Sequence, residues 1–366
     1  MKRKLGVYIH IPFCNGKCAY CDFTSGVYSD EIKQAYFKSL ISEIMNFDFS
    51  EYVVDTVYFG GGTPSSVSAS YITEIVYALK AQVELDINCE FSIECNPESV
   101  TEEKLYTYKK IGINRISLGL QTTNNEILKS IGRLHDLKDF ISAIDLTNKY
   151  FDNVSADLML GLPLQNASDV TNAIKLLAEK SVKHVSAYGL KVEEGTSLAK
   201  SGFTPDEDFT SYLYDLTVNE LAKLGYTRYE VSNFAMPGYE CKHNKRYWNR
   251  SEYFGFGVSA QSFVKYARIE NTSDLSEYIK GKTVAQKYFI LSNSPEAKVE
   301  MIMLALRTSD GLDLTEFYEN FGIDLIKDKS STISALSDFL IVDNTKLKLS
   351  NKGYYVMNEI ILRLID

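Results

Sequence analysis

The sequence predicts an α/β protein: a partial (β/α)6 barrel followed by a mainly helical, winged-helix-like C-terminal domain. Three observations lead to this prediction. The length of 366 residues allows two domains, or one barrel-sized domain with an appendage. Up to about residue 235, short β-branched and aromatic runs alternate with amphipathic segments, which is the pattern of βα units around a parallel sheet. Beyond that point the alternation stops.

Six short runs are expected to be the barrel strands, with helical patterns between them. Residues 72–79 carry apolar side chains at the i, i+3, i+4, i+7 spacing of one helix face, and residues 170–177 repeat that spacing. Gly112 and Gly225 follow helical patterns and are expected to end those helices. The expected strands are residues 5–11, 55–59, 89–95, 115–120, 154–160 and 184–190.

The part of the chain after residue 235 is expected to begin as a loop and to continue as helices. The loop, residues 236–257, carries aromatic residues and the only tryptophan, Trp248. The elements expected after it are helices at residues 296–306 and 312–321, a hairpin at residues 340–349 with its turn at Asp343 and Asn344, and a last helix. This order is similar to that of a winged helix.

These patterns divide the chain into a barrel (1–235), a connecting region (236–290) and a helical domain (291–366). Winged helices often bind nucleic acid. The chain, however, has 39 basic and 48 acidic residues, a formal net charge of −9, which disfavours contact with phosphate backbones or anionic lipid. Without a helix dense in Lys and Arg, the C-terminal domain is expected to serve in packing or as a lid, not in nucleic-acid binding.

The location of the protein is predicted to be the cytoplasm. No apolar run reaches the roughly 18 residues of a membrane-spanning helix. The apolar stretch at residues 5–11 ends in Pro12 and Phe13 without the small residues of a signal-peptide cleavage site. The sequence leaves the oligomeric state open, because no heptad or exposed apolar repeat marks an interface.

Three of the six cysteines crowd directly after the first expected strand. Cys14, Cys18 and Cys21 give the spacing C-x3-C-x2-C, which favours a metal site in a reducing compartment over a disulfide framework. Three thiolates on one loop can hold three irons of a [4Fe-4S] cube and leave the fourth iron without a protein ligand. That iron can bind the amino and carboxylate groups of S-adenosylmethionine (SAM), and a reduced cluster can pass an electron to its sulfonium.

A structural zinc ion is the alternative for these cysteines. Zinc takes four ligands, usually as two spaced pairs, and His10 is near enough in sequence to complete such a site. As a mid-strand residue, His10 is expected instead to pack in the sheet. The scattered Cys89, Cys95 and Cys241 are expected to be small buried apolar residues.

At the cysteine triplet the sequence resembles the radical SAM superfamily, whose signature is this spacing. The resemblance implies a radical SAM barrel with a cluster and bound SAM, and it assigns residues at the strand ends to the amino group, ribose and carboxylate of SAM. Any one of these residues could instead be a turn glycine, a core aromatic or a solvated polar group. The residues assigned to SAM are Tyr8, Tyr20, Gly61, Gly62, Thr63, Glu94, Gln121, Arg133 and Asp157.

Within the superfamily, the resemblance extends over nearly the whole chain to two groups: oxygen-independent coproporphyrinogen III dehydrogenases and HemW-type haem chaperones. The dehydrogenases carry a fourth cysteine two residues after the triplet, where this chain has Phe23. They also have a long N-terminal extension, whereas seven residues precede Tyr8 here. Both differences favour the chaperone group, and they argue against carrying over the second SAM of the dehydrogenases.

The segment from His243 to Trp248 matches the H-N-x-x-Y-W motif of the haem chaperones. An imidazole can ligate haem iron, and the faces of Tyr247 and Trp248 can stack on a porphyrin. The alternative is a loop anchored by a buried tryptophan, with His243 in a structural hydrogen bond. Both readings of His243 stay open at this point.

The resemblance therefore implies a haem chaperone with a [4Fe-4S] cluster, SAM and haem as bound cargo. It would deliver haem to haem-requiring proteins, of which membrane respiratory enzymes are the expected recipients through transient contact. One alternative is a coproporphyrinogen dehydrogenase, which would remove two carboxyl groups by radical chemistry. The other is a zinc-stabilised scaffold.

Overall fold

The structure is a computed structural model that describes residues 2–343 and 345–366. Its largest element is a twelve-stranded sheet in the order β12-β11-β10-β9-β1-β2-β3-β4-β5-β6-β8-β7. The six strands β1 to β6 lie side by side in this order and form five parallel pairs. They are β1 (Arg3–Ile11), β2 (Tyr52–Gly61), β3 (Leu85–Cys95), β4 (Arg115–Gln121), β5 (Asn153–Leu160) and β6 (His184–Gly189), so all six expected strands are confirmed.

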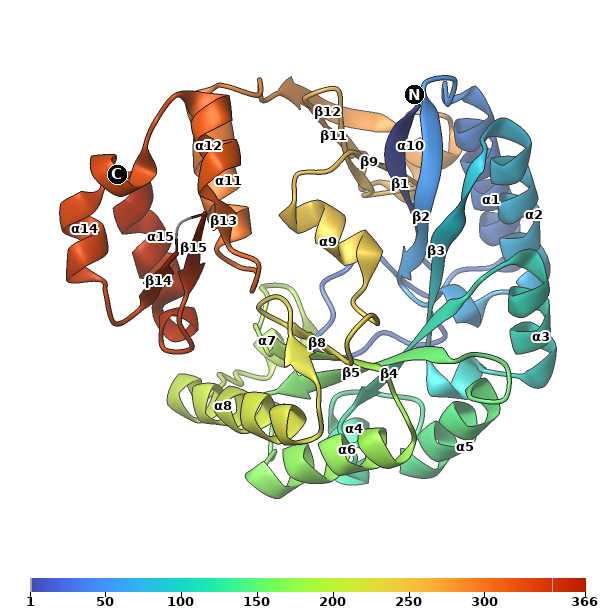
Figure 1. Ribbon diagram of the computed structural model, residues 1–366. Helices are drawn as coiled ribbons and strands as arrows, with labels where there is room; N and C mark the ends of the chain where they lie inside the picture. The colour runs from blue at the N-terminus through green and yellow to red at the C-terminus, as the bar shows by residue number, and fades with distance from the viewer. Residues whose placement is uncertain (1, 344) are drawn as a thin grey trace.

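Helices cover the outer face of this curved sheet (Figure 1). They follow the strands in the alternating order that the sequence predicts. Gly112 ends α3 in the left-handed conformation, with φ 102°, as expected of a helix stop. The helices of this part are α1 (Asp30–Asn46), α2 (Ala69–Gln82), α3 (Glu102–Ile111), α4 (Asn125–Ser130), α5 (Leu137–Thr147), α6 (Ala167–Glu179), α7 (Ser197–Lys200) and α8 (Glu207–Lys223).

The central strands are apolar on the helix side and polar on the other. Leu5, Val7 and Ile9 of β1 are fully buried in the core, and because side chains alternate along a strand, Tyr8 and His10 point to the opposite face. Buried polar side chains line this opposite face on the neighbouring strands: Thr56, Glu90, Ser92, Arg115, Ser117, Ser155, His184 and Ser186. The inner face is thus built for polar groups.

The expected loop at residues 236–257 contains a short helix and a strand, and the mainly helical course expected after it is wrong up to residue 289, because residues 253–289 add four strands to the sheet. β9 (Tyr253–Phe256) lies parallel to β1, while β10 (Gln261–Val264), β11 (Ala267–Asn271) and β12 (Val284–Phe289) continue antiparallel. These strands have four to six residues, which is too short for a two-residue period to stand out. The pairing of β9 with β1, from Gly6 with Tyr253 to Ile9 with Phe256, joins segments far apart in the chain.

Shorter elements complete the sheet and its surroundings. β7 (Thr227–Arg228) and β8 (Asn233–Ala235) extend the other edge, with β8 antiparallel to β6. Two short helices follow, α9 (Lys242–Trp248) and α10 (Leu275–Ile279). Figure 1 shows α9 on the inner side of the curved sheet, opposite the outer helices.

The C-terminal region has a hydrophobic core of its own, built around residues such as Ile302, Phe317 and Leu347. The expected helix at residues 312–321 starts later, because Leu312 and Asp313 form a strand that pairs with β15. The expected hairpin is confirmed as β14 and β15, although Asn344 of its turn lies outside the described residues. The elements are α11 (Pro295–Ala305), β13 (Leu312–Asp313), α12 (Leu314–Phe321), α13 (Leu325–Asp328), α14 (Ser330–Ala335), β14 (Leu340–Val342), β15 (Lys346–Leu349) and α15 (Met357–Ile365).

The helical C-terminal region is therefore confirmed, while its likeness to a winged helix stays a prediction. Contacts of Arg228 link it to the sheet: the guanidinium lies 3.5 Å from the centre of the Tyr354 ring and donates to Asn351. Among the described residues, no helix combines the length and the apolar character needed to cross a membrane.

Gly257 is a sensitive point where β9 meets β1. It has φ 104°, and a Cβ there would lie 2.5 Å from the Tyr36 hydroxyl and 2.9 Å from the His10 carbonyl oxygen. We predict that Gly257→Ala lowers the free energy of unfolding by about 2–5 kcal/mol, since overpacking adds to backbone strain. Gly238 also has positive φ but open space around it, so Gly238→Ala is the control. Equal losses in urea unfolding would contradict the packing argument.

Candidate active site

A cavity of about 420 Å³ opens at the carboxyl ends of the parallel strands. Its walls are the loops that follow β1 to β6, as expected for an α/β barrel. The predicted residues that line it are Cys14, Cys18, Cys21, Tyr20, Gly61, Gly62, Thr63, Glu94, Gln121, Arg133 and Asp157. The structure thus brings all three cysteines together with eight of the nine residues assigned to SAM. The ninth, Tyr8, lines a neighbouring cavity.

The cysteine loop is held in place by its own hydrogen bonds. The Cys14 amide donates to the Gly26 carbonyl, and the Gly26 amide donates to Pro12, both at 2.9 Å. The Lys17 ammonium donates to the carbonyl of Phe23 at 2.6 Å. All three cysteines are free thiols and are half-buried, so each can be reached from the cavity.

Polar donors face two of the three sulfur atoms. The Thr63 hydroxyl donates to Cys14 Sγ at 3.6 Å, and the Arg133 guanidinium donates to Cys18 Sγ at 3.7 Å. Burial raises the pKa of the Cys14 thiol, and the hydrogen bond from Thr63 works in the opposite direction. Such donors stabilise thiolates, which are the ligand form of cysteine.

This donor set fits a [4Fe-4S] cube. The cube takes one thiolate at each of three irons, so its cysteines have to face a shared cavity and need not converge on one point. Among residues 2–343 and 345–366, no group of three His, Cys, Asp or Glu side chains is arranged to hold a single metal ion. His10 is buried, and its ring nitrogens lie 3.1 Å from the Tyr8 hydroxyl and 2.9 Å from the Thr24 carbonyl, in keeping with the expected packing role.

The glycine segment after β2 packs directly on the cysteine loop. A Cβ at Gly62 would lie 2.9 Å from the Phe13 carbonyl oxygen and 3.0 Å from Cys14 Sγ. Backbone amides of Gly62 and Thr63 donate to Ile11 and Phe13 at 2.8 Å. Only a residue without a side chain allows this approach, so the glycines place β2 backbone against the proposed cluster ligands.

Two half-buried carboxyl groups face the cavity, one from Glu94 and one from Asp157. The Tyr58 hydroxyl donates to Glu94 at 2.8 Å, and Ser117 donates to Asp157 at 3.3 Å. Burial, together with the charge of Asp157, raises the pKa of Glu94 to about 7, and burial also raises the pKa of Asp157. A cationic ligand in the cavity would lower both pKa values, since a positive charge favours the ionised carboxylates.

Arg133 and Gln121 line the same cavity close to the end of β4, the strand between those of Glu94 and Asp157. The Arg133 guanidinium donates to Asn96 Oδ1 at 2.8 Å and to the Gly119 carbonyl at 3.0 Å. Gln121 has φ 67°, a left-handed backbone at a non-glycine residue, which concentrates at functional sites. Two further residues, Tyr58 and Asn96, support or line the site without having been predicted from the sequence. Their sequence signal is only a place within or just after a strand.

The H-N-x-x-Y-W segment forms α9 and is anchored on the inner face of the sheet. The Glu90 carboxylate accepts hydrogen bonds from the amides of Lys242 (3.0 Å) and His243 (3.1 Å) and thereby caps the helix start. Arg246 forms an ion pair with Asp55 and donates to the Thr56 hydroxyl at 3.1 Å. The helix is therefore fixed from both ends.

The His243 side chain is fully enclosed. Its Nδ1 lies 2.9 Å from the Thr56 hydroxyl and its Nε2 lies 2.9 Å from the Tyr247 hydroxyl, while the ring stacks on Tyr58 at 5.3 Å. Burial lowers the pKa of His243 to about 3, so the ring is neutral. Of the two readings left open by the sequence, these contacts match the structural hydrogen bond. Trp248 is half-buried.

The other cysteines are placed largely as expected. Cys95 and Cys241 are buried, and Cys89 is half-buried. Cys95 also lines the cavity that contains Cys14, Cys18 and Cys21. The Cys241 thiol donates to the Glu90 carboxylate at 3.4 Å, which makes it part of the α9 anchor.

Comparison with known proteins shows the family to which this chain belongs. The model of the Radical SAM superfamily matches residues 8–177, and that of the HemN C-terminal domain matches residues 294–356. A protein of Lactococcus lactis named "Heme chaperone HemW" is 33% identical over 98% of this chain and 97% of its own length. A Bacillus subtilis protein of the same name is 32% identical over 96% and 97%. The chain belongs to the HemW family.

Among solved structures, coproporphyrinogen III oxidase (HemN) from Escherichia coli resembles this HemW-family chain with a TM-score of 0.86. The match covers 99% of this chain and 90% of that one at 21% sequence identity. It shows that the two proteins share a fold. The radical SAM fold predicted from the cysteine spacing is thereby confirmed, together with the HemW-type resemblance.

Glu94 gives this HemW-family protein a testable pH dependence. With a folded pKa of about 7 against 4.5 for the ordinary group, the folded state holds more protons than the unfolded state between these values. Its contribution to stability is full below about pH 4.5 and is lost as the pH rises through 7. As the pH rises, this group lowers the free energy of unfolding by up to about 1.4 kcal/mol per pH unit. We predict that Glu94→Gln removes this decline.

The measurement is urea unfolding of the cluster-free protein at intervals from pH 5 to pH 8. Glu103 on α3 is exposed, so Glu103→Gln is the matched control and keeps the wild-type slope. A Glu94→Gln protein with an unchanged slope would show that this carboxyl group is not the titrating one.

Proposed function

We propose that this protein is a haem chaperone that carries a [4Fe-4S] cluster, SAM and haem, and that it passes haem to haem-requiring proteins. The observation that carries the proposal is the shared cavity, which gathers three free thiols and eight residues assigned to SAM. Membership of the HemW family, whose relatives bear the name "Heme chaperone HemW", supports haem as the cargo.

Cys14, Cys18 and Cys21 would hold the cluster, which supplies an electron to the sulfonium of SAM when both are bound. The protein's own residues bind and orient. Ionised Glu94 and Asp157 offer negative charge to the cationic ligand in a cavity shielded from water, where charge interactions are strong. Backbone at Gly61 and Gly62 allows close approach of the methionine part. Arg133 and Gln121 offer donors for the carboxylate and ribose oxygens, and Tyr20 completes the wall.

Haem would be a cargo, held near α9 through Tyr247 and Trp248, with His243 fixing the helix or ligating the iron. Recipients would include membrane respiratory enzymes, met through transient contact in the cytoplasm. The acidic balance does not oppose this, because a porphyrin needs apolar faces more than bulk positive charge.

Coproporphyrinogen dehydrogenation is the second candidate, favoured by the shared fold with coproporphyrinogen III oxidase. Phe23 in place of a fourth cysteine counts against it. The test is anaerobic incubation of reconstituted protein with reductant, SAM and coproporphyrinogen III, beside a haem titration. Haem binding without protoporphyrinogen formation supports the chaperone. Catalytic formation of protoporphyrinogen would overturn it.

Cysteine variants test the cluster assignment. We predict that Cys14→Ala, Cys18→Ala or Cys21→Ala abolishes the [4Fe-4S] electron paramagnetic resonance signal, because the cube loses one of only three protein ligands. Cys89 lies on β3 outside the cavity, so Cys89→Ala is the matched control and keeps the signal. Iron and sulfide analysis checks the same samples. Bound zinc without iron in the wild-type protein would favour the scaffold alternative.

A further inference from the structure

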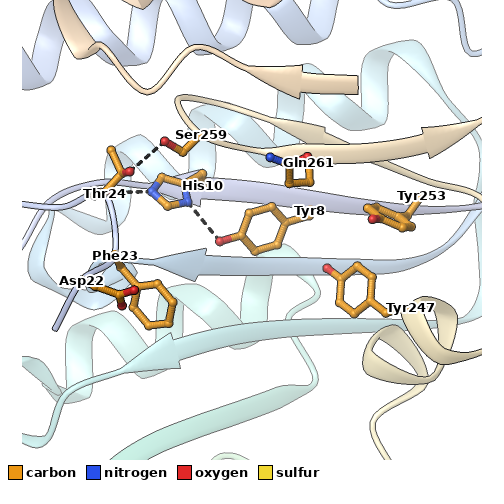
Figure 2. Close-up of a pocket in the computed structure, with 9 residues that line it drawn as sticks. All are labelled: Tyr8, His10, Asp22, Phe23, Thr24, Tyr247, Tyr253, Ser259 and Gln261. Atoms are coloured by element: carbon orange, nitrogen blue, oxygen red, sulfur yellow. Dashed lines mark hydrogen bonds between the residues drawn. The ribbon is translucent and has the colours of Figure 1, made fainter. Parts of the chain in front are cut away.

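A second cavity lies beside the first, between the cysteine loop and the added strands. Its volume is about 490 Å³, within the range of small-molecule sites. Figure 2 shows Asp22 and Phe23 of the cysteine loop at its left end and Tyr247 and Tyr253 at its right end, with Tyr8 between them. The cavity is thus assembled from β1, β9, α9 and the loop of the proposed cluster ligands.

Flat aromatic side chains dominate the walls. Tyr8, Tyr247 and Tyr253 contribute rings from three different elements, and the Tyr247 and Tyr253 rings meet edge to face at 4.7 Å. Phe23 is 65% exposed, an unusual state for a phenylalanine that stands on a cavity wall. Covering it with an apolar planar ligand would remove this exposed surface from water.

The other lining residues are polar, and Asp22 is the acidic one among them. Gln261 of β10 lies at the rim, and the Ser259 hydroxyl donates to Thr24 at 2.7 Å within the wall. The lining includes no lysine or arginine, so the carboxylates of a bound porphyrin would stay in water at the open side. A large planar apolar ligand with charged groups at one edge suits such a site better than a phosphate or a nucleotide.

The cavity also offers no imidazole nitrogen that is free to bind iron. Its single histidine, His10, has both ring nitrogens in hydrogen bonds. His243 lies behind Tyr247, again with both nitrogens engaged. The three tyrosine hydroxyls of the wall are engaged as well, Tyr8 with His10, Tyr247 with His243 and Tyr253 with Arg268.

We propose that haem binds in this second cavity, stacked on Phe23 and the tyrosine rings, without ligation by His243 or His10. The inference rests on the proposed function and names the place where its cargo, haem, would bind. His243 is then a positioning residue that holds the Tyr247 hydroxyl. A haem held by its faces can be passed on without breaking an iron–imidazole bond, which suits a carrier whose acceptor supplies the ligand.

Two pairs of variants test the site by anaerobic haem titration of the reconstituted full chain, followed at the Soret band. Gln261→Trp narrows the cavity, and Gln286→Trp is its control, since Gln286 lies in the same row of the sheet two strands away. Phe23→Ala removes an aromatic wall, and Phe289→Ala is matched to it, with the parent side chains 65% and 63% exposed.

We expect Gln261→Trp to raise the haem Kd at least tenfold and Phe23→Ala to raise it about three- to tenfold. The two controls should bind haem like the wild type, and all variants should keep the cluster signal. Gln261→Trp should also keep SAM binding, because Gln261 lines the second cavity and not the first, whereas Phe23 lines both. The ferric haem spectrum should lack the low-spin signature of imidazole ligation. His243→Ala should lower stability but leave the spin state unchanged.

Each contrary result points to a different failure. A wild-type protein that takes up no haem would overturn the proposed function itself. Haem binding that is unaffected by both Gln261→Trp and Phe23→Ala would leave that function standing and overturn the site. The site would also be overturned if the wild-type protein bound a second SAM and Gln261→Trp lost that SAM while it bound haem normally. An imidazole-type spectrum that His243→Ala abolishes would overturn the proposed mode of binding.

Discussion

The alternation of side chains along β1 to β6 is the constraint on which the rest of the structure depends. Helices cover one face, so the outward residues can be apolar and supply the core. The inward residues are then free to be polar, and many are both polar and buried. Because buried polar groups need partners, this face cannot remain empty. At the carboxyl ends of the strands this face adjoins the cysteines and the residues assigned to SAM. Farther from these ends it packs against α9.

The α9 anchor follows from the same constraint. The buried Glu90 carboxylate takes its partners from the start of this segment, the amides of residues 242 and 243 and the Cys241 thiol. Thr56 is shared between His243 and Arg246. Tyr58 then joins the two regions, because its ring stacks on His243 while its hydroxyl donates to Glu94 in the first cavity. The haem-chaperone motif and the SAM residues therefore share one layer of packed side chains, so a change at one can reach the other.

The sequence predicted what depends on local pattern. All six barrel strands were placed, since each is a run of β-branched or aromatic residues, and the cysteine spacing pointed to the cluster. Residues 253–289 were missed because strands of four to six residues show little period of their own, and their place is decided by pairing, of β9 with β1 and then of each added strand with the next. The role of His243 could not be decided either, since its hydrogen-bond partners Thr56 and Tyr247 come from separate elements. Tyr8 was assigned to the first cavity but lines the second.

Phe23 stands at the boundary between the two cavities. It follows Cys21 closely and lines both cavities, as does Asp22. A cysteine at this position would place a reactive thiol between the proposed SAM site and the second cavity. A phenylalanine instead offers an inert, flat apolar face toward both. If radical chemistry requires a polar or reactive group at this boundary, its replacement by an aromatic wall converts a place for reaction into a place for holding a planar ligand.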